Sequence, residues 1–253
     1  MMSHLSRRTV LVALPALALP ACATPSPETS DALAALEAKA NGRLGVFILD
    51  AGTGWSIGHR QDERFALCST FKLTLAALIR REVDAGRLSL EERIAFGPED
   101  MVANAPIAQA YLAQGFMTIG QMAEGTQKTS DNVCANLLLP LLGGPEGFTR
   151  RVRDLGDAVT RVDRYEPEMN NVPPGEVRDT TSPQAMARLM QTLLVGDALK
   201  ADSRATLIQW MIDTETGLRR IRAGLPSSWI AGDKTGTGYR EDLGNKTHDI
   251  ASA

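Results

Sequence analysis

The stretch Ser69-Thr70-Phe71-Lys72 places a hydroxyl three residues before an amine. If these residues open a helix, both side chains lie on one face and the amine reaches the hydroxyl. Apolar residues flank the stretch at 65–68 and 73–78, so Lys72 is expected to enter a buried helix. A buried amine loses basicity and can take up a proton, while the helix N-terminus favours negative charge near Ser69. For this stretch alone, a capping serine and a solvated lysine remain the simpler interpretation.

A second motif, Ser130-Asp131-Asn132, carries a small hydroxyl beside a carboxyl and an amide. Such a group can shuttle a proton and hold a substrate carbonyl. The same triplet is a good helix N-cap sequence, and capping is compatible with catalysis.

The loop from 161 to 179 contains Glu166 and Asn170. A carboxylate and an amide four residues apart can hold one water for attack on an acyl carbonyl. Arg164 and Asp179 are predicted to pair across the loop ends and hold that carboxylate in place. Solvated surface charges are the alternative interpretation of this loop.

The fourth motif is Lys234-Thr235-Gly236. A lysine and a hydroxyl at a strand edge suit a substrate carboxylate, and Gly236 allows a ligand to approach the backbone. Thr237 adds a hydroxyl and a backbone N–H. Arg220 is a candidate second clamp for that carboxylate, although a surface arginine in a basic run explains it equally well. Together, the four motifs supply a nucleophile, proton carriers, a base and a cationic anchor for acyl transfer from an amide to water.

The composition is that of an ordinary globular enzyme. The chain has 253 residues, 27 Lys and Arg against 30 Asp and Glu, and 43% hydrophobic residues. This near balance of charge shows no basic footprint for nucleic acid or a membrane surface. No Cys/His cluster has metal-ligand spacing and no glycine-rich phosphate loop is present, so we expect neither a metal nor another cofactor.

The first 23 residues have the pattern of an export signal. Arg7 and Arg8 precede an apolar run at 10–19, and small residues follow. The arginine pair also fits the twin-arginine variant. Leu19-Pro20-Ala21-Cys22 resembles a lipobox, which would give a lipid anchor through Cys22; plain cleavage after Ala23 is the alternative. Either way, we expect an exported, periplasmic protein.

Hydrophobic periodicity predicts helices over 31–40, 69–83, 118–128, 130–142, 145–155, 183–194 and 200–213, with strands over 43–50, 55–59 and 229–234. Strands at both ends of a helical middle predict an α+β fold with two lobes. The expected division is the export signal at 1–23, the first part of an α/β lobe at 24–60, an all-α lobe at 61–212 and the second part of the α/β lobe at 213–253. Cys68 and Cys134 are expected to be free, buried thiols.

The four motifs in this order resemble those of the class A serine β-lactamases. The resemblance extends from about residue 42 to residue 249, and includes an Ω-loop-like stretch at 161–170 and Leu141-Leu142-Gly143-Gly144-Pro145. It implies a two-lobed fold with an antiparallel sheet flanked by helices. It also implies hydrolysis of penicillins and cephalosporins, and hence antibiotic resistance, by a monomer whose only partner is the small substrate.

The resemblance further implies a role for each motif. Ser69 would attack the lactam carbonyl with Lys72 or Glu166 as base, and Ser130 would pass a proton to the departing nitrogen. Glu166 would then activate the deacylating water. The oxyanion would bind the backbone N–H groups of Ser69 and Thr237. The expected substrate-binding residues are Asn132, Asn170, Arg220, Lys234, Thr235, Gly236 and Thr237.

Three features depart from the family pattern. Cys68 resembles the carbapenem-hydrolysing subgroup, but its usual disulfide partner near Gly238 is absent. The aromatic at the cleft rim is replaced around 104–106. Further strands and a C-terminal helix normally follow the Lys-Thr-Gly strand, so the end at Ala253 is interpreted as a truncation that weakens folding. The competing functions are a penicillin-binding D-alanyl-D-alanine peptidase, against which the Glu166/Asn170 pair argues, and an inactive truncated remnant.

Overall fold

The computed structural model describes residues 27–240, 242 and 244–253. The expected export signal and Cys22 lie outside the described residues. The helices are α1 Pro27–Ala40, α2 Phe71–Asp84, α3 Pro106–Tyr111, α4 Ile119–Lys128, α5 Asn132–Leu138, α6 Gly144–Asp154, α7 Pro183–Leu194 and α8 Ala201–Ile212. The strands are β1 Val46–Leu49, β2 Ser56–His59, β3 Phe65–Ala66, β4 Arg93–Ala95, β5 Phe116–Thr118, β6 Thr180–Thr181, β7 Gly232–Arg240 and β8 Gly244–Ser252.

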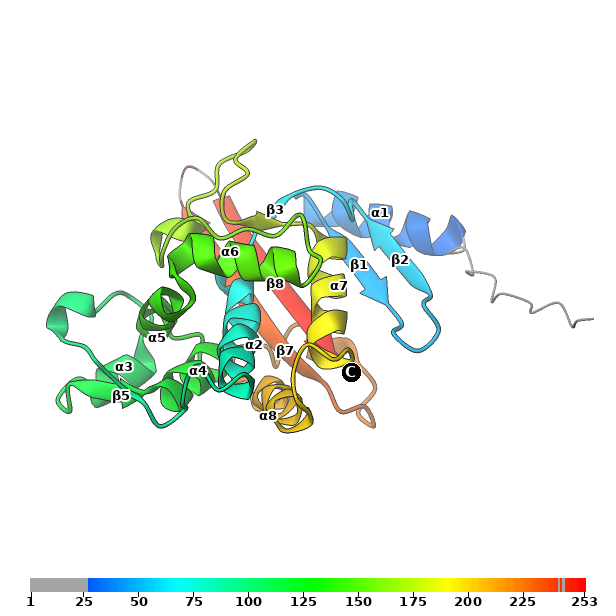
Figure 1. Ribbon diagram of the computed structural model, residues 1–253. Helices are drawn as coiled ribbons and strands as arrows, with labels where there is room; N and C mark the ends of the chain where they lie inside the picture. The colour runs from blue at the N-terminus through cyan, green and yellow to red at the C-terminus, as the bar shows by residue number, and fades with distance from the viewer. Residues whose placement is uncertain (1–26, 241, 243) are drawn as a thin grey trace, which may run out of the picture.

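Helix α2 runs through the middle of the molecule (Figure 1). Every residue from 71 to 80 is buried, because helices α4 to α8 all contact α2. A helix that is apolar nearly all round is typical of a core position. Lys72 lies in the first turn of α2, and its side chain is completely buried. The fold therefore places an amine in the core next to the segment that carries Ser69.

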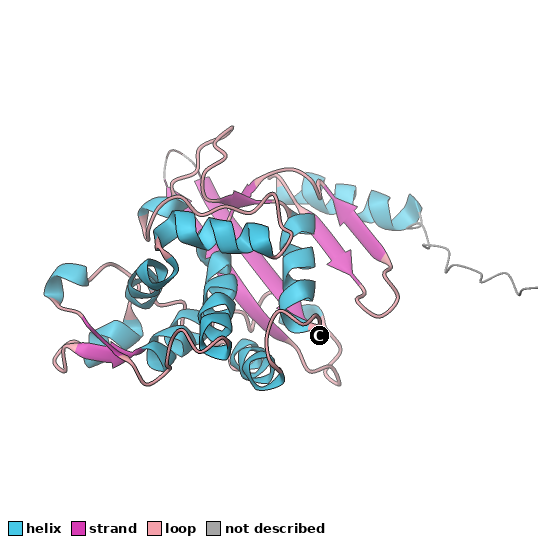
Figure 2. Cartoon of the chain, in the orientation of Figure 1, coloured by secondary structure: helices cyan, strands magenta, loops and turns pink. Residues whose placement is uncertain are grey.

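The strands pair as antiparallel ladders, which Figure 2 shows among the surrounding helices. The longest ladder joins β7 to β8, from Gly232 opposite Ser252 to Arg240 opposite Gly244. It passes behind α2 in Figure 1, while β1, β2 and α1 lie to one side and α3, α4 and α5 to the other. The predicted α+β fold is confirmed.

Several predicted element boundaries were wrong. The helix expected at 31–40 begins at Pro27, and the strand expected at 43–50 covers only Val46–Leu49. The strand expected at 229–234 begins at Gly232 and continues to Arg240, and β8 follows it. The helix expected at 130–142 begins only at Asn132 and becomes a 3₁₀ helix at residues 139–142. The Asp131 side chain caps the helix start, and Pro140 has no N–H to continue the α-helical hydrogen bonds.

The middle of the chain was predicted to be almost entirely helical, but it also contains the β4–β5 ladder. These strands have three residues each, too few for an alternating pattern to be recognised. Cys68 and Cys134 are free and buried, as predicted. Within the described residues, no helix is long and apolar enough to cross a membrane.

Candidate active site

Ser69 lies in a short 3₁₀ segment, Cys68–Thr70, directly before α2. The Nζ atom of Lys72 donates to Ser69 Oγ at 3.0 Å and to the carbonyl oxygen of Ser130 at 2.9 Å. Burial lowers the pKa of Lys72, an effect that the neighbouring Glu166 carboxylate partly offsets. Lys72 therefore lies next to the Ser69 hydroxyl with reduced basicity. Its neutral form, which can accept a proton, is reached at lower pH than that of an ordinary lysine.

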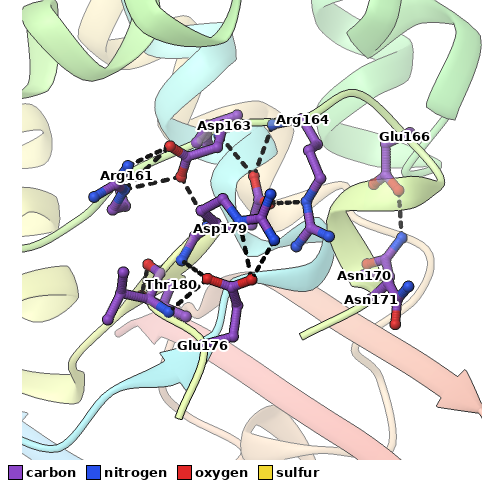
Figure 3. A network of polar contacts seen from close by, with 12 residues as sticks. Arg161, Asp163, Arg164, Glu166, Asn170, Asn171, Glu176, Asp179 and Thr180 are labelled. Atoms are coloured by element: carbon purple, nitrogen blue, oxygen red, sulfur yellow. Dashed lines mark hydrogen bonds and ion pairs between the residues drawn. The ribbon is translucent and has the colours of Figure 1, made fainter. Parts of the chain in front are cut away.

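The Glu166 carboxylate contacts both the Ser69 hydroxyl and the Lys72 amine. Its Oε1 atom is 3.1 Å from Lys72 Nζ and accepts a hydrogen bond from Ser69 Oγ at 3.3 Å. Its Oε2 atom accepts from the amide of Asn170 (Figure 3). Because the Glu166 side chain is completely buried, its charge acts in a medium that screens weakly. The predicted pair of Glu166 and Asn170 is therefore in contact, and Glu166 links Asn170 to the Ser69 hydroxyl.

The predicted pair at the ends of the loop is confirmed. Arg164 Nε contacts Asp179 Oδ2 at 2.5 Å, and Figure 3 shows this pair at the base of the loop. Asp179 is fully buried and its Oδ1 atom also accepts the backbone N–H groups of Asp163, at 2.7 Å, and Arg164, at 3.0 Å. The loop that carries Glu166 is therefore closed by a charged and hydrogen-bonded clasp.

Asn136 supports the Glu166 backbone, and the sequence analysis missed this contact. Its Nδ2 atom donates to the Glu166 carbonyl oxygen at 2.8 Å, and its Oδ1 atom accepts the Glu166 N–H at 2.9 Å. Both hydrogen bonds fix the backbone of Glu166. The spacing in the sequence could have indicated this residue, because Asn136 follows Asn132 by four residues and shares its face of α5.

Ser130 lies between two buried lysines. Its carbonyl accepts from Lys72, and its hydroxyl accepts from Lys234 Nζ at 3.0 Å. Ser130 has a left-handed backbone with φ of 62°, which L-residues rarely adopt. Asn104, which was also missed, donates from Nδ2 to the Ser130 carbonyl at 2.8 Å and supports this conformation.

The amide of Asn132 joins the same cluster. Its Oδ1 atom accepts from Lys72, and its Nδ2 atom donates to the Ala103 carbonyl at 2.8 Å. The preceding residue, Asp131, is fully buried and accepts the N–H groups of Cys134, Ile107 and Ala108. Asp131 therefore caps α5 and binds the α3 segment, while Asn132 faces the amine.

Strand β7 forms the opposite wall. A Cβ atom at Gly236 would lie 3.0 Å from Thr70 Cγ2 and 3.2 Å from Cys68 Cβ, so only glycine lets the strand lie this close to the Ser69 segment. Burial, together with the charge of Lys72, holds the pKa of Lys234 well below its ordinary value. The strand therefore places the buried amine of Lys234 beside the Ser130 hydroxyl.

Arg220 lies along β7 and belongs to the site. Its guanidinium donates to the Gly236 carbonyl at 3.1 Å, to the Thr237 hydroxyl at 2.8 Å and to the His248 carbonyl. None of these acceptors is charged, so the positive charge of Arg220 stays available to an anion. Thr235 pairs with Thr216 through their hydroxyl oxygens at 2.7 Å, a contact that sequence patterns did not indicate.

Comparisons with known proteins agree with this geometry. The model of the beta-lactamase enzyme family matches residues 28–252. The L2 β-lactamase of Stenotrophomonas maltophilia is 42% identical over 233 residues, 89% of this chain and 77% of that protein. A β-lactamase of Mycobacterium tuberculosis (strain ATCC 25618 / H37Rv) is 45% identical over 228 residues, 88% of this chain and 72% of that protein. The chain belongs to the β-lactamase family.

Solved structures place it in class A. An ancestral class A β-lactamase (GNCA) aligns with a TM-score of 0.84 and 49% identity, over 88% of this chain and 84% of that one. A β-lactamase of Xanthomonas campestris pv. campestris aligns with a TM-score of 0.83 and 45% identity, over 88% and 82% of the two chains. The chain is a class A serine β-lactamase.

In this class A β-lactamase a cavity of about 300 Å³ lies between the Glu166 loop and β7. Asn170, Asn171, Thr237 and Gly238 are among its lining residues. A Cβ atom at Gly238 would lie 3.1 Å from the sulfur of Cys68. Burial raises the pKa of the Cys68 thiol to about 12, so this sulfur stays protonated and unreactive at neutral pH.

The structure brings all the predicted site residues of the β-lactamase together. Hydrogen bonds and an ion pair join Asn170 to Glu166, Glu166 to Ser69 and Lys72, Lys72 to Ser130 and Asn132, and Ser130 to Lys234. On the opposite wall, Arg220 joins Gly236 and Thr237, next to Thr235.

Proposed function

We propose that this class A β-lactamase hydrolyses penicillins and cephalosporins through an acyl-enzyme on Ser69, which gives antibiotic resistance. One observation carries the proposal: the Ser69 hydroxyl lies 3.0 Å from Lys72 Nζ and 3.3 Å from Glu166 Oε1. A nucleophile in contact with both an amine of lowered pKa and a buried carboxylate is the arrangement that serine activation requires.

In acylation, the Ser69 oxygen attacks the lactam carbonyl carbon. Its proton passes to Lys72 or to Glu166, both of which lie within hydrogen-bond distance of the hydroxyl. The backbone N–H groups of Ser69 and Thr237 stabilise the negative oxygen of the tetrahedral intermediate. Ser130 then gives its proton to the lactam nitrogen as the C–N bond breaks, and the proton taken from Ser69 passes on to Ser130 and restores its hydroxyl. Lys234, 3.0 Å away, supports the developing charge on Ser130.

In deacylation, Glu166 and Asn170 hold the attacking water between their side chains and the ester carbon. Glu166 takes one proton as the water oxygen bonds to the carbonyl carbon. The bond between that carbon and Ser69 Oγ breaks, and the proton returns to Ser69. The clasp of Arg164 and Asp179 and the two bonds from Asn136 support this step, because they fix the backbone that carries Glu166.

The substrate carboxylate binds at β7. Lys234 and Arg220 supply two positive charges, and Thr235 and Thr237 supply hydroxyls on the same strand. Gly236 keeps the strand close enough to Ser69 for one substrate to reach both groups. Asn132 completes the opposite wall, where its amide can bind a substrate carbonyl.

We further propose that the enzyme works outside the cytoplasm as a monomer. Support comes from residues 1–23, where Arg7 and Arg8 precede an apolar run and Cys22 follows a lipobox-like sequence. The mass of the mature N-terminus tests this proposal. A diacylated Cys22 would indicate a periplasmic lipoprotein, cleavage after Ala23 a free periplasmic enzyme, and an intact Met1 would contradict export.

Intact-mass spectrometry after rapid mixing with a penicillin tests the function. We expect a transient adduct of substrate mass on Ser69 and hydrolysis of a many-fold excess of drug. The adduct should not form in Ser69→Ala. In the control Ser227→Ala, at a surface serine, it should form and decay as in the wild type. A stable wild-type adduct would instead indicate a penicillin-binding protein, and no adduct an inactive remnant.

A further inference from the structure

A second cavity, of about 740 Å³, lies between the C-terminal end of α2 and the C-terminal half of α6. Its walls carry five arginines, namely Arg81, Arg87, Arg150, Arg151 and Arg153. We call it the arginine cavity. None of the catalytic or substrate-binding residues lines it, so the proposed reaction does not explain its charge.

The arginine cavity is strongly positive in a protein of net charge −3. The lining includes two carboxylates, Glu82 and Asp154, and Glu146 outside the lining pairs with Arg150 at 2.7 Å, which leaves an excess of two positive charges. Arginines at the C-terminal ends of helices offset the negative end of the helix dipole, about half a charge for each helix. Two helices, α2 and α6, end here, so about one of the two charges remains without such an explanation.

Glu82 fixes part of the wall. It is only 5% exposed, and Arg87 and Arg151 both donate to its carboxylate, at 2.6 and 3.1 Å. These arginines hold the pKa of Glu82 at about 2, so the carboxylate stays charged at neutral pH. One anion shared by two cations leaves a fixed positive charge at this position.

Two other arginines have no anion to neutralise them. Arg153 donates to the carbonyl oxygens of Asp157, at 2.5 Å, and Thr160, at 2.6 Å, which hold its guanidinium without cancelling its charge. Arg81 has no hydrogen bond or ion pair with the side chains of other described residues. The cavity therefore combines a pre-positioned guanidinium with a free one.

We propose that the arginine cavity binds a ligand with two or more adjacent phosphate groups. Planar guanidinium groups donate paired hydrogen bonds that match the spacing of phosphate oxygens. The cavity has the volume of an ordinary small-molecule site and exceeds what one inorganic phosphate fills. The phosphates come either from a soluble phosphorylated compound or from anionic lipid headgroups.

Calorimetric titration of the full chain with inorganic pyrophosphate at low ionic strength tests this site. Arg81→Ala should weaken binding about three- to fivefold, since it removes one unpaired charge, and Asp154→Asn should strengthen binding by a similar factor. The matched control is Arg93→Ala, an exposed arginine on β4 outside the cavity. Penicillin hydrolysis should be unchanged in all three variants, which separates this proposal from the proposed function.

Co-sedimentation with phosphatidylglycerol vesicles identifies the source of the phosphates. Vesicle binding that falls in Arg81→Ala and is displaced by pyrophosphate would assign the cavity to a lipid headgroup. Pyrophosphate binding that vesicles do not compete with would assign it to a soluble ligand. No pyrophosphate binding by the wild type, or an equal loss in Arg93→Ala, would overturn the proposal.

Discussion

The ammonium nitrogen of Lys234 lies 3.0 Å from the hydroxyl oxygen of Ser130. Both lysines of the site, Lys72 and Lys234, have fully buried side chains, and each contacts this one serine. Burial lowers the pKa of both. The protein therefore stabilises a cation at Lys234 less than water would, and in the proposed function the substrate carboxylate supplies the missing counter-charge.

Replacing Lys234 should weaken catalysis in a pH-dependent way. Lys234→Ala should lower kcat/KM about 10- to 150-fold, which corresponds to the loss of a hydrogen bond to a charged group, about 1.5–3 kcal/mol. In the wild type, kcat/KM should fall on the alkaline side at a pH below that of an ordinary lysine, because the cation is lost above its lowered pKa.

Lys234→Arg keeps a positive charge at this position but removes the group that we expect to titrate. A guanidinium stays protonated at all working pH values, so the alkaline fall in kcat/KM should move to higher pH. An unchanged alkaline limb in this variant would assign the titration to another group.

Asn136→Ala should affect deacylation more than acylation. The variant loses both hydrogen bonds to the Glu166 backbone, which we expect to cost about 1–3 kcal/mol of stability. Pre-steady-state kinetics should show acyl-enzyme accumulating. The control is Asn171→Ala, whose amide contacts Arg240 at the loop surface. Equal slowing in both variants would contradict a specific role for Asn136.

Removing the two partners of the loop clasp should have unequal effects. Asp179→Ala removes the acceptor of the Asp163 and Arg164 N–H groups. It also removes the ion-pair partner of the Arg164 guanidinium. We expect a loss of about 3–5 kcal/mol, against about 1–2 kcal/mol for Arg164→Ala, whose side chain reaches solvent. Urea unfolding of both variants measures the difference. A larger loss in Arg164→Ala would show that Asp179 is not the centre of the clasp.

Asp233 and Asp249 form a second pH-sensitive feature below β7. Asp233 Oδ1 lies 2.9 Å from Arg222 Nη2, but Asp233 Oδ2 and Asp249 Oδ1 are buried without a hydrogen-bond partner, which a proton held between the two carboxyls would satisfy. Burial raises the pKa of both acids, to about 6 for Asp249. A raised acid pKa stabilises the fold below the ordinary value near 3.8, and this stability is lost as the pH rises through about 6.

Asp249→Asn should therefore reduce the loss of stability between pH 4.5 and 7.5. After allowance for partial exposure, we expect a difference of about 1–2 kcal/mol, or several degrees in Tm. Thermal unfolding across this pH range measures it. Asp242→Asn, at an exposed carboxylate, is the control and should follow the wild type. A parallel pH profile for Asp249→Asn would exclude proton sharing.

Residues that are neighbours in sequence could be predicted; distant supports could not. The spacing of Ser69 and Lys72 on one helix face fixes their contact, and Glu166 with Asn170 follows the same logic within one loop. Asn104 and Asn136 reach backbone atoms 26 and 30 residues away, which no local pattern encodes.

The predicted boundaries of β7 were wrong for a different reason. Gly236 and Gly238 have low strand propensity, so the pattern ended at Lys234. The structure extends the strand because β8 pairs with it residue by residue and because close packing on the Ser69 segment requires glycine. Tertiary contact therefore overrides local propensity at the site itself.

The most direct test of the central claim is the fate of the acyl-enzyme in Glu166→Ala. The variant should still acylate at Ser69, because Lys72 remains 3.0 Å from the hydroxyl, but should hold the adduct for many minutes. Intact mass and hydrolysis rate are measured together, with Glu168→Ala, an exposed acid two residues away, as control. A stable adduct in Glu166→Ala alone is the predicted result. Undiminished turnover in Glu166→Ala would contradict the assignment of Glu166 as the deacylating base.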